Sequence, residues 1–152
     1  MKTLITTHNI FDLPETSHDA VCITTNGCIK KDGRAVMGKG IAKEANTRYQ
    51  LDAELAKHLK QLGNIPHVFL QKGEHNCFLI SFPTKEHWRD KSIPALILQS
   101  ARYLVRLCDE QEIKRCYLTP PGCGCGGLDW SFEVAPILKD ILDDRFVIVF
   151  QQ

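Results

Sequence analysis

Short apolar segments alternate along the chain with segments of helical composition, and this alternation most restricts the possible fold. Ala20–Thr24 and Phe146–Phe150 are apolar at almost every position, which is typical of strands that are buried on both faces. A sheet built from such strands needs helices over both of its sides. The sequence therefore predicts an α/β domain with a mixed, mostly parallel sheet.

Periodicity and turn residues place the individual elements. The most distinct is a helix over Ile93–Glu110, whose apolar residues recur at a spacing of three and four after Ser92, a capping residue type. No repeat or linker interrupts the chain, so we expect a single domain over residues 1–152. The other expected helices are Ile41–Tyr49, Ala53–Leu62 and one from Pro136 to about Leu142, and the expected strands are Thr3–Thr7, Ala20–Thr24, His67–Lys72, Cys77–Phe82, Cys116–Thr119 and Phe146–Phe150.

Charge and cysteine content restrict the class of protein. Nineteen basic and eighteen acidic residues nearly cancel, whereas proteins that bind nucleic acid non-specifically usually carry a basic excess. General nucleic-acid binding is therefore not indicated, except through a specific pocket. Seven cysteines without a recognisable signal peptide indicate reduced thiols and a cytoplasmic location, and no apolar run is long enough to cross a membrane.

The first glycine-rich loop lies before the Ile41–Tyr49 helix. The run from Gly33 to Gly40 nearly matches the phosphate loop of nucleoside triphosphatases, but Gly40 stands where a hydroxyl residue would hold magnesium. Glycines at 38 and 40 still allow backbone N–H groups to approach an anion at the start of a helix. The alternative is a tight turn that only leads into the helix.

The second glycine-rich loop, Gly122–Gly127, has four glycines in six residues after an apolar strand. It formally contains a dinucleotide-binding motif, yet only one strand follows, which is too little chain for that fold. So dense a loop is entropically costly as a mere connection, and we interpret it as backbone shaped around a diphosphate. Cys123 and Cys125 suggest a zinc alternative with Cys77 or Cys116, but their spacing is unusual for zinc, and packing beside the glycines is favoured.

A third segment, Ser81–Arg89, combines two aromatic residues with several ionisable ones directly after a predicted strand. Each of these side chains alone is typical of an exposed turn. The cluster of Lys85, His87 and Arg89 beside Trp88 is less easily explained by solvent exposure alone.

Taken together, five segments of the chain resemble the macrodomains, most closely the branch with the DarG antitoxin macrodomains and the terminal ADP-ribose glycohydrolases. They cover essentially the whole chain in the expected order. The resemblance implies a three-layer α/β/α sandwich with a cleft for ADP-ribose and without a metal or cofactor. The segments are Asn9–Asp12, Thr25–Gly27, Val36–Ala42, Phe82–Arg89 and Pro121–Trp130.

The resemblance also implies roles for residues that match its motifs. Asn9 and Ile10 would contact adenine, although the family commonly has aspartate at the position of Asn9. Asn26 would lie near the distal ribose, and Thr84 would also bind the substrate. The first phosphate loop would comprise Met37, Gly38, Lys39, Gly40 and Ile41, and the second phosphate and distal ribose would be wrapped by Gly122, Cys123, Gly124, Cys125, Gly126, Gly127 and Leu128.

Lys85 matches the lysine to which that branch assigns a catalytic role. It could attack the anomeric carbon or the opened sugar, provided that burial or Arg89 favours the neutral amine. Relatives that pair this lysine with an aspartate carry the acid in the second glycine loop, where this chain has Gly126, and the nearest acid is Asp129. Cys28–Ala35 is also longer than the connection usual in the branch.

The implied function is hydrolysis of ADP-ribosyl groups from modified DNA or protein, or from a small derivative. A non-catalytic reader of ADP-ribose and a phosphatase acting on ADP-ribose 1″-phosphate are the alternatives, since both would use the same pocket. The expected partners are ADP-ribose or an ADP-ribosylated substrate. The sequence does not choose among these substrates or identify a toxin partner.

Overall fold

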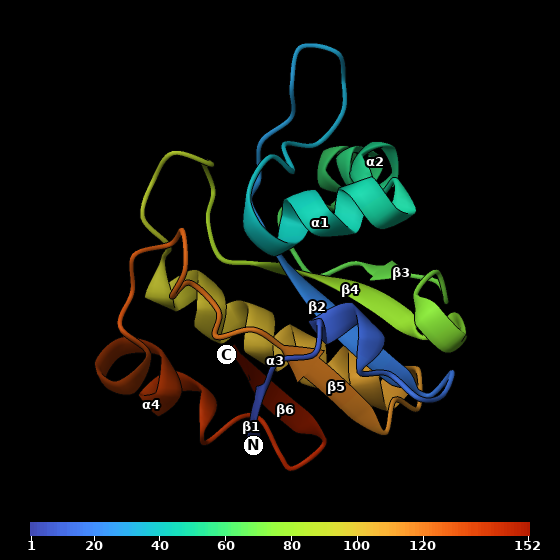
Figure 1. Ribbon diagram of the computed structural model, residues 1–152. Coiled ribbons are helices and arrows are strands. Elements are labelled where there is room, and N and C mark those ends of the chain that lie inside the picture. The colour runs from blue at the N-terminus through green and yellow to red at the C-terminus, as the bar shows by residue number, and fades with distance from the viewer.

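The computed structural model describes all residues from Met1 to Gln152 and contains one six-stranded sheet (Figure 1). Its strands are β1 (Lys2–Thr6), β2 (Asp19–Thr25), β3 (Val68–Phe69), β4 (Phe78–Pro83), β5 (Arg115–Leu118) and β6 (Phe146–Gln151). They lie in the order β1-β6-β5-β2-β4-β3. All neighbouring pairs are parallel except β3 and β4, which confirms the predicted mixed, mostly parallel sheet.

Helices cover both faces of the sheet and give the molecule three layers. α1 (Gly40–Tyr49) and α2 (Asp52–Leu62) lie over one face, and α3 (Pro94–Glu110) and α4 (Ala135–Leu138) lie over the other (Figure 1). Strand β2 shows why both faces are covered, because successive side chains point to opposite sides. Ala20 and Cys22 pack with residues of α3, whereas Val21 and Ile23 pack with residues of α1 and α2.

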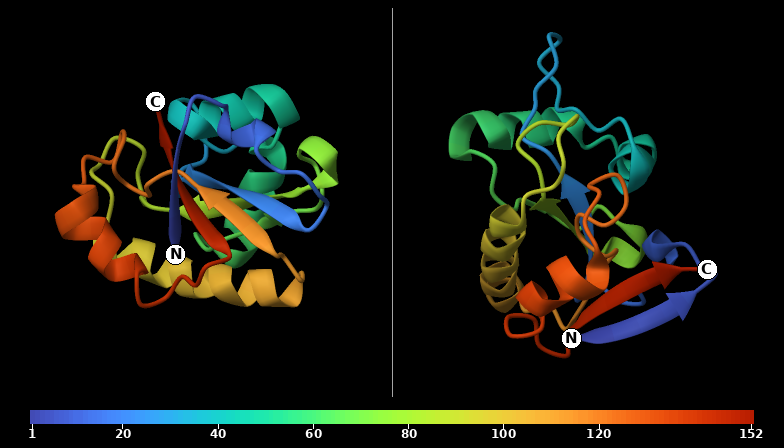
Figure 2. Two further views of the ribbon diagram at one scale, coloured as in Figure 1. Left: turned by 60° about the horizontal axis from the view of Figure 1, so that its bottom comes forward. Right: turned by 90° about the vertical axis from the view of Figure 1, so that its left-hand side faces the viewer.

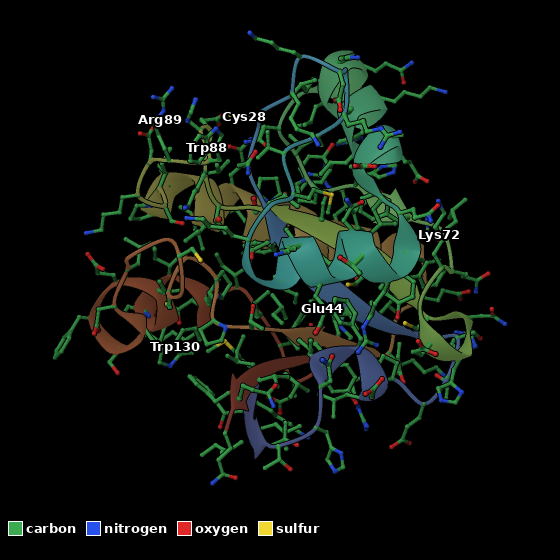
Figure 3. The ribbon with its side chains drawn as sticks, turned by 45° about the horizontal axis from the view of Figure 1, so that its top comes forward. Cys28, Glu44, Lys72, Trp88, Arg89 and Trp130 are labelled. Atoms are coloured by element: carbon green, nitrogen blue, oxygen red, sulfur yellow. The ribbon has the colours of Figure 1, made fainter.

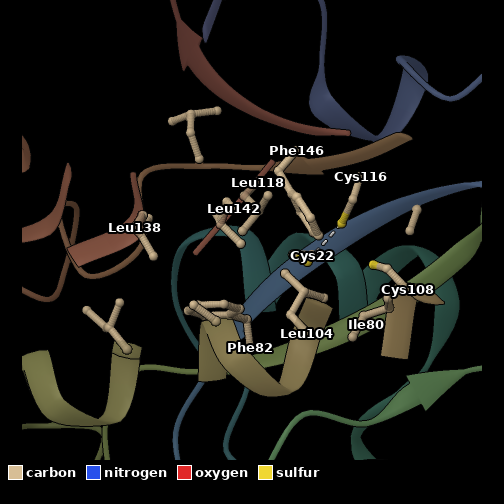
Figure 4. Packing of buried hydrophobic residues seen from close by; sticks show 14 of the residues in the cluster. Cys22, Ile80, Phe82, Leu104, Cys108, Cys116, Leu118, Leu138, Leu142 and Phe146 are labelled. Carbon is tan, nitrogen blue, oxygen red and sulfur yellow. Dashed lines mark hydrogen bonds between the residues drawn. The ribbon is translucent and has the colours of Figure 1, made fainter. Parts of the chain in front are cut away.

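The core on the α3 side contains Cys22, Cys108 and Cys116 (Figure 4). The Sγ atoms of Cys22 and Cys116 lie 3.4 Å apart, and all seven cysteines are unpaired, as expected for reduced thiols. Complete burial raises the pKa of the Cys116 thiol well above its ordinary value. These thiols therefore behave as small apolar side chains.

The predicted capping role of Ser92 is wrong. Helix α3 begins at Pro94, and its N-cap is Ile93, in an extended conformation with φ −110° and ψ 112°. Proline disfavours helical geometry in the preceding residue and suits the first helical turn, so Pro94 sets this boundary. The Ser92 hydroxyl is buried and makes no hydrogen bond within the protein.

Two other elements are shorter than predicted. The helix expected to run to about Leu142 ends as an α-helix at Leu138, and it is preceded by a π-helical turn over Trp130–Val134. Asp129 accepts a hydrogen bond from the Phe132 N–H at 2.7 Å, so helical structure starts earlier than the sequence pattern indicates. The strand expected over His67–Lys72 is reduced to β3, because Gln71 has a φ of 42° and leaves the extended region.

Three connections meet at the carboxyl edge of the central strands. The segment after β2 projects as a narrow arm, and the segments after β4 and β5 lie close together (Figure 2). Because β4 and β5 flank β2 on its two sides, their carboxyl ends surround the same point of the sheet. No helix is long and apolar enough to cross a membrane.

Candidate functional site

A cleft of about 800 Å³ lies at this edge of the sheet. All three connections contribute to its wall. Twelve of the residues predicted from the sequence line it, namely Asn26, Met37, Gly38, Lys39, Gly40, Ile41, Thr84, Lys85, Gly122, Cys123, Gly124 and Cys125. The structure therefore brings together the two glycine-rich loops and the Thr84–Lys85 segment, which are far apart in sequence.

The first glycine-rich loop leads directly into α1. The N-cap of α1, Lys39, has an extended backbone, and its side chain forms no capping hydrogen bond. Gly40 adopts a φ of 59°, which few side chains tolerate, and neither Gly38 nor Gly40 has any neighbour where a Cβ atom would lie. The first N–H groups of α1 therefore face the cleft, and no side chain blocks them. The positive end of the helix dipole lies at the same place, so the site favours binding of an anion.

Backbone hydrogen bonds fix the conformation of the second glycine-rich loop. The Ser92 N–H donates to the Gly126 carbonyl at 2.9 Å, and the Leu128 N–H donates to the Gly122 carbonyl at 2.9 Å. A Cβ atom on Gly126 would collide with the Ser92 hydroxyl and with the Gly122 backbone. Gly126, Gly127 and Leu128 do not line the cleft, and Leu128 is buried in the core. Only the outer part of the loop, Gly122–Cys125, lines the cleft.

Lys85 connects its own loop, which follows β4, to the second glycine-rich loop. Its Nζ donates to the carbonyl oxygen of Cys125 at 3.2 Å and to that of Trp88 at 3.3 Å. The backbone under it is fixed, because Asn64 Nδ2 donates to the Lys85 carbonyl at 2.9 Å and the Thr84 N–H donates to the Thr25 carbonyl at 3.0 Å. Arg89 contacts His87 and the Trp88 ring. Lys85 is therefore a positioned cation on the cleft wall.

The cleft is electropositive. Lys39 and Lys85 line it, and no aspartate or glutamate does. Asp129, the acid nearest to the second loop in sequence, instead caps the π-helical turn through the Phe132 N–H. Burial, with a smaller effect of Asp129 and Glu133, raises the pKa of the Cys123 thiol to about 11, so this thiol stays neutral at physiological pH. The wall therefore suits an anionic ligand.

Asn9 and Ile10 lie outside this cleft. Asn9 Oδ1 accepts from the Phe11 N–H at 2.9 Å, and its Nδ2 donates to both carboxylate oxygens of Glu44, at 2.9 and 3.1 Å. Ile10 is buried. Sequence reasoning missed Glu44, which lies on α1 (Figure 3) one turn after Gly40. Its hydrogen bonds with Asn9 place a carboxylate beside that residue. The spacing of four residues from the loop is the only signal that could have indicated it.

Other wall residues were also missed. Thr25 lines the cleft, is buried, and has a hydroxyl without a hydrogen-bond partner in the protein. Trp88 and Trp130, which come from the loops after β4 and β5, add aromatic surface to the wall. Asn46 is half-buried and structural, because its Oδ1 accepts from the N–H groups of Leu51 and Asp52 at 2.9 and 3.0 Å.

Metal ligands were considered for the cysteines of the second loop. The structure contains no group of three or more histidine, cysteine, aspartate or glutamate side chains that could hold a metal ion. Cys77 and Cys116 are both buried within the two core clusters.

A mixed six-stranded sheet between two helical layers, with glycine-rich loops at its carboxyl edge, gives the chain the macrodomain fold. In sequence and structure it matches the macrodomains of DarG proteins. The DNA ADP-ribosyl glycohydrolase of Mycobacterium tuberculosis is 32% identical over 151 residues, which cover 96% of this chain and 39% of that protein. The solved macrodomain of Mycobacterium tuberculosis DarG has a TM-score of 0.72 and 28% identity, with 98% of each chain covered.

A second structure gives the same fold at lower identity. Thermosipho africanus DarTG, solved in complex with ADP-ribose, has a TM-score of 0.77 and 21% identity over 97% of this chain and 41% of that one. No protein-family model matches the chain. The chain spans about two fifths of the length of the curated relative from Mycobacterium tuberculosis.

Proposed function

We propose that this macrodomain binds ADP-ribose and hydrolyses ADP-ribosyl groups from modified DNA, with Lys85 as the catalytic residue. The observation that carries the proposal is the position of Lys85 Nζ, which joins the second glycine-rich loop to the Trp88 loop across an electropositive cleft. Sequence relatives named DNA ADP-ribosyl glycohydrolase support DNA as the substrate.

The geometry supports one orientation of ADP-ribose. The diphosphate lies between the uncapped start of α1 and the outer part of the second loop, where backbone N–H groups and a helix terminus favour negative charge. The distal ribose lies toward Asn26 and Lys85. The adenine lies toward Asn9 and Ile10, where the Glu44 carboxylate supplies an acceptor for the adenine amine that Asn9 alone would provide more weakly.

Hydrolysis breaks the bond between C1″ of the distal ribose and the base nitrogen. The oxygen of water ends on C1″, and a proton ends on the base. Lys85 contributes by one of two routes. As an ammonium ion, it stabilises the negative charge that develops on the departing base. As a neutral amine, it displaces the base at C1″ of the opened sugar and forms an imine, which water then hydrolyses to release ADP-ribose and free Lys85. The first route needs only the cation, whereas the second needs the amine itself.

The test compares Lys85→Ala with Lys85→Arg on ADP-ribosylated single-stranded DNA. Lys85→Ala lowers turnover by about a hundredfold or more, while the Kd for ADP-ribose measured by calorimetry changes little. Lys85→Arg keeps the charge, so substantial turnover supports the electrostatic route. Loss of turnover in both variants, together with a borohydride-trapped adduct on the wild type only, supports the imine. Full activity of Lys85→Ala overturns the assignment.

A non-catalytic reader is the second candidate, because no carboxylate lines the cleft to act as a general base. A reader binds ADP-ribose with the same loops but releases nothing from any substrate. A substrate panel of ADP-ribosylated DNA, aspartate- or glutamate-modified protein and ADP-ribose 1″-phosphate separates the candidates. Release of ADP-ribose from DNA alone supports the hydrolase, and binding without any release supports the reader.

The proposed substrate is the product of a DNA ADP-ribosyl transferase, which would be the toxin partner of this chain. A relative from Thermosipho africanus combines such a transferase with the glycohydrolase in one fusion protein. A cytoplasmic location fits both the DNA substrate and seven unpaired thiols, since thiols stay reduced there.

A further inference from the structure

A second hollow, of about 400 Å³, lies between α2 and the arm Cys28–Ala35. It is lined by Asp32, Gly33, Arg34, Ala53, Ala56, Lys57, Lys60 and Gln61. Three of these side chains are cationic and one is anionic. The Asp32 carboxylate is already engaged, because it accepts from the Arg34 N–H at 2.9 Å and lies 3.9 Å from Lys30 Nζ. Arg34, Lys57 and Lys60 form no ion pair in the protein, so the hollow is strongly basic.

The arm that forms one wall of the hollow is well ordered by backbone contacts. Ile29 and Ala35 form an antiparallel bridge, and the Lys30 N–H donates to the Arg34 carbonyl at 2.7 Å. The Ala35 N–H donates to the Asp52 carbonyl at the start of α2, at 3.0 Å. Figure 2 shows the arm standing away from the body of the molecule. It contributes little apolar packing, so its length calls for another explanation.

The basic hollow is connected to the cleft through two short links. Lys60 precedes Asn64 by four residues, and Asn64 Nδ2 donates to the Lys85 carbonyl. At the base of the arm, Cys28 Sγ lies 3.5 Å from the carbonyl of Glu86, and Asn26, on the cleft wall, donates to the Val36 carbonyl. These contacts place the base of the arm and the end of α2 next to the loop that carries Lys85.

An exposed aromatic residue lies on the same side. Trp88 lines the cleft yet remains 49% exposed, and the Arg89 guanidinium lies 5.8 Å from its ring centroid. Figure 3 places Trp88 and Arg89 beside Cys28 at the base of the arm. Proteins that bind single-stranded nucleic acid combine an exposed aromatic ring, on which bases stack, with unpaired cations, which bind phosphates.

We propose that the basic hollow binds backbone phosphates of the DNA strand that flanks the ADP-ribosylated nucleotide, while Trp88 stacks on a neighbouring base. This inference rests on the proposed function and adds a strand-binding surface to it. A polyanion fits better than a polypeptide, because three unpaired cations face one engaged carboxylate. The near-neutral net charge is compatible with this, because the excess of positive charge is confined to one surface.

The test uses the triple variant Arg34→Ala/Lys57→Ala/Lys60→Ala. A matched control, Arg102→Ala/Lys114→Ala/Lys139→Ala, removes the same charge from exposed positions outside the cleft and the basic hollow. On an ADP-ribosylated oligonucleotide the hollow variant raises KM on the order of tenfold at unchanged kcat, and the control changes it little. On a single ADP-ribosylated nucleotide, both variants behave like the wild type. The Kd for free ADP-ribose is unchanged in both.

Salt dependence gives a second measurement. The slope of log Kd against log salt for oligonucleotide binding falls by about 0.7 for each single-strand phosphate contact that is lost. Trp88→Ala weakens oligonucleotide binding without changing this slope, because stacking releases no counterions. An equal loss for the oligonucleotide and the single nucleotide, or an equal loss in the control, overturns the proposal. The proposal is also overturned if the hollow variant loses activity only on ADP-ribosylated acidic protein.

Failure of the proposed function is distinguishable from failure of this inference. If the wild type releases no ADP-ribose from any oligonucleotide, the hydrolase proposal fails. Fluorescence anisotropy with an unmodified single-stranded oligonucleotide still measures the strand contact, because phosphates and bases are present without the modification. Weaker binding by the hollow variant than by the control supports the inference, and equal binding of the two overturns it.

Discussion

At the scale of single residues, the second glycine-rich loop depends on one position more than on the others. Gly126 lies against the Ser92 hydroxyl and the Gly122 backbone, whereas Gly124 has no neighbour within 4 Å of a Cβ position. Both glycines belong to the same loop, but only one of them is required by packing.

We expect Gly126→Ala to lower the free energy of unfolding by about 1–3 kcal/mol, because the added methyl group displaces backbone rather than a flexible side chain. Urea denaturation measures the change. Gly124→Ala is the matched control and leaves stability within about 0.5 kcal/mol of the wild type. Since Gly124 lines the cleft, its methyl group weakens ADP-ribose binding instead. Equal stability of the two variants would contradict this account of the loop.

The thiols of the same loop differ in reactivity for a physical reason. Because the pKa of Cys123 is raised to about 11, its thiolate is scarce at neutral pH, and the thiolate is the reactive form. We expect its alkylation by iodoacetamide, followed by peptide mass spectrometry in Cys125→Ser, to accelerate with pH up to about 11. A rate that levels off below pH 9 would be inconsistent with the burial of this thiol. Bound ADP-ribose slows the reaction, since Cys123 lines the cleft.

At the scale of secondary-structure elements, Asn46 joins α1 to α2. Its Oδ1 accepts from Leu51 N–H and Asp52 N–H, and Gln50, the first of the two residues between the helices, adopts a left-handed φ of 54°. α2 has no capping bond from its own N-cap, Leu51. The side chain that satisfies the first amides of α2 therefore comes from the preceding helix.

Asn46→Ala is expected to lower the free energy of unfolding by about 1 kcal/mol, the usual loss for a helix cap. Thr47→Ala, at an exposed neighbouring position, is the control and changes stability by less than about 0.5 kcal/mol. The midpoints of thermal unfolding of the two variants give the comparison. If Asn46→Ala is as stable as Thr47→Ala, the inter-helix bond does not contribute.

The elements also show how far the sequence determines the fold and the site. Apolar strands such as β2 and β6, and the apolar stripe of α3, are apparent from periodicity, and twelve of the predicted site residues line the cleft. Glu44 and Thr25 were missed because their roles depend on packing between segments that are distant in sequence. The role of Ser92 was misassigned because a capping residue type alone does not account for a following proline.

At the scale of the whole molecule, Arg145 joins the last strand to the end of α3. Its guanidinium binds Asp143 at 2.9 Å and Asp109 at 2.8 Å. The hydrogen bond from the Arg145 side chain lowers the pKa of Asp143 below its ordinary value of 3.8, and this effect is larger than that of partial burial, which raises the pKa. A carboxyl group with a lowered pKa contributes stability above its ordinary pKa, and the contribution disappears as the pH falls through the folded-state pKa.

We therefore expect Asp143→Asn to be less stable than the wild type at pH 7, and the difference to shrink as the pH falls below about 4. The difference at pH 7 stays below about 1 kcal/mol, because the Asp143 side chain is 52% exposed and its ion pair is screened by solvent. Urea denaturation at a series of pH values measures it. If the difference in the free energy of unfolding instead grows as the pH falls, the ion pair does not stabilise the protein in this way.

The placement of β6 between β1 and β5 has a consequence for synthesis of the protein. Residues Lys2–Thr6 pair only with Val147–Gln151, so the first strand has no partner in the sheet until almost all of these residues have left the ribosome. Ribosomes add about 5–20 residues each second, so the N-terminal strand stays unpaired for several seconds. In a nascent chain that stalls before Phe146, β1 therefore has no strand to pair with, although the central strands β2 and β4 are already complete.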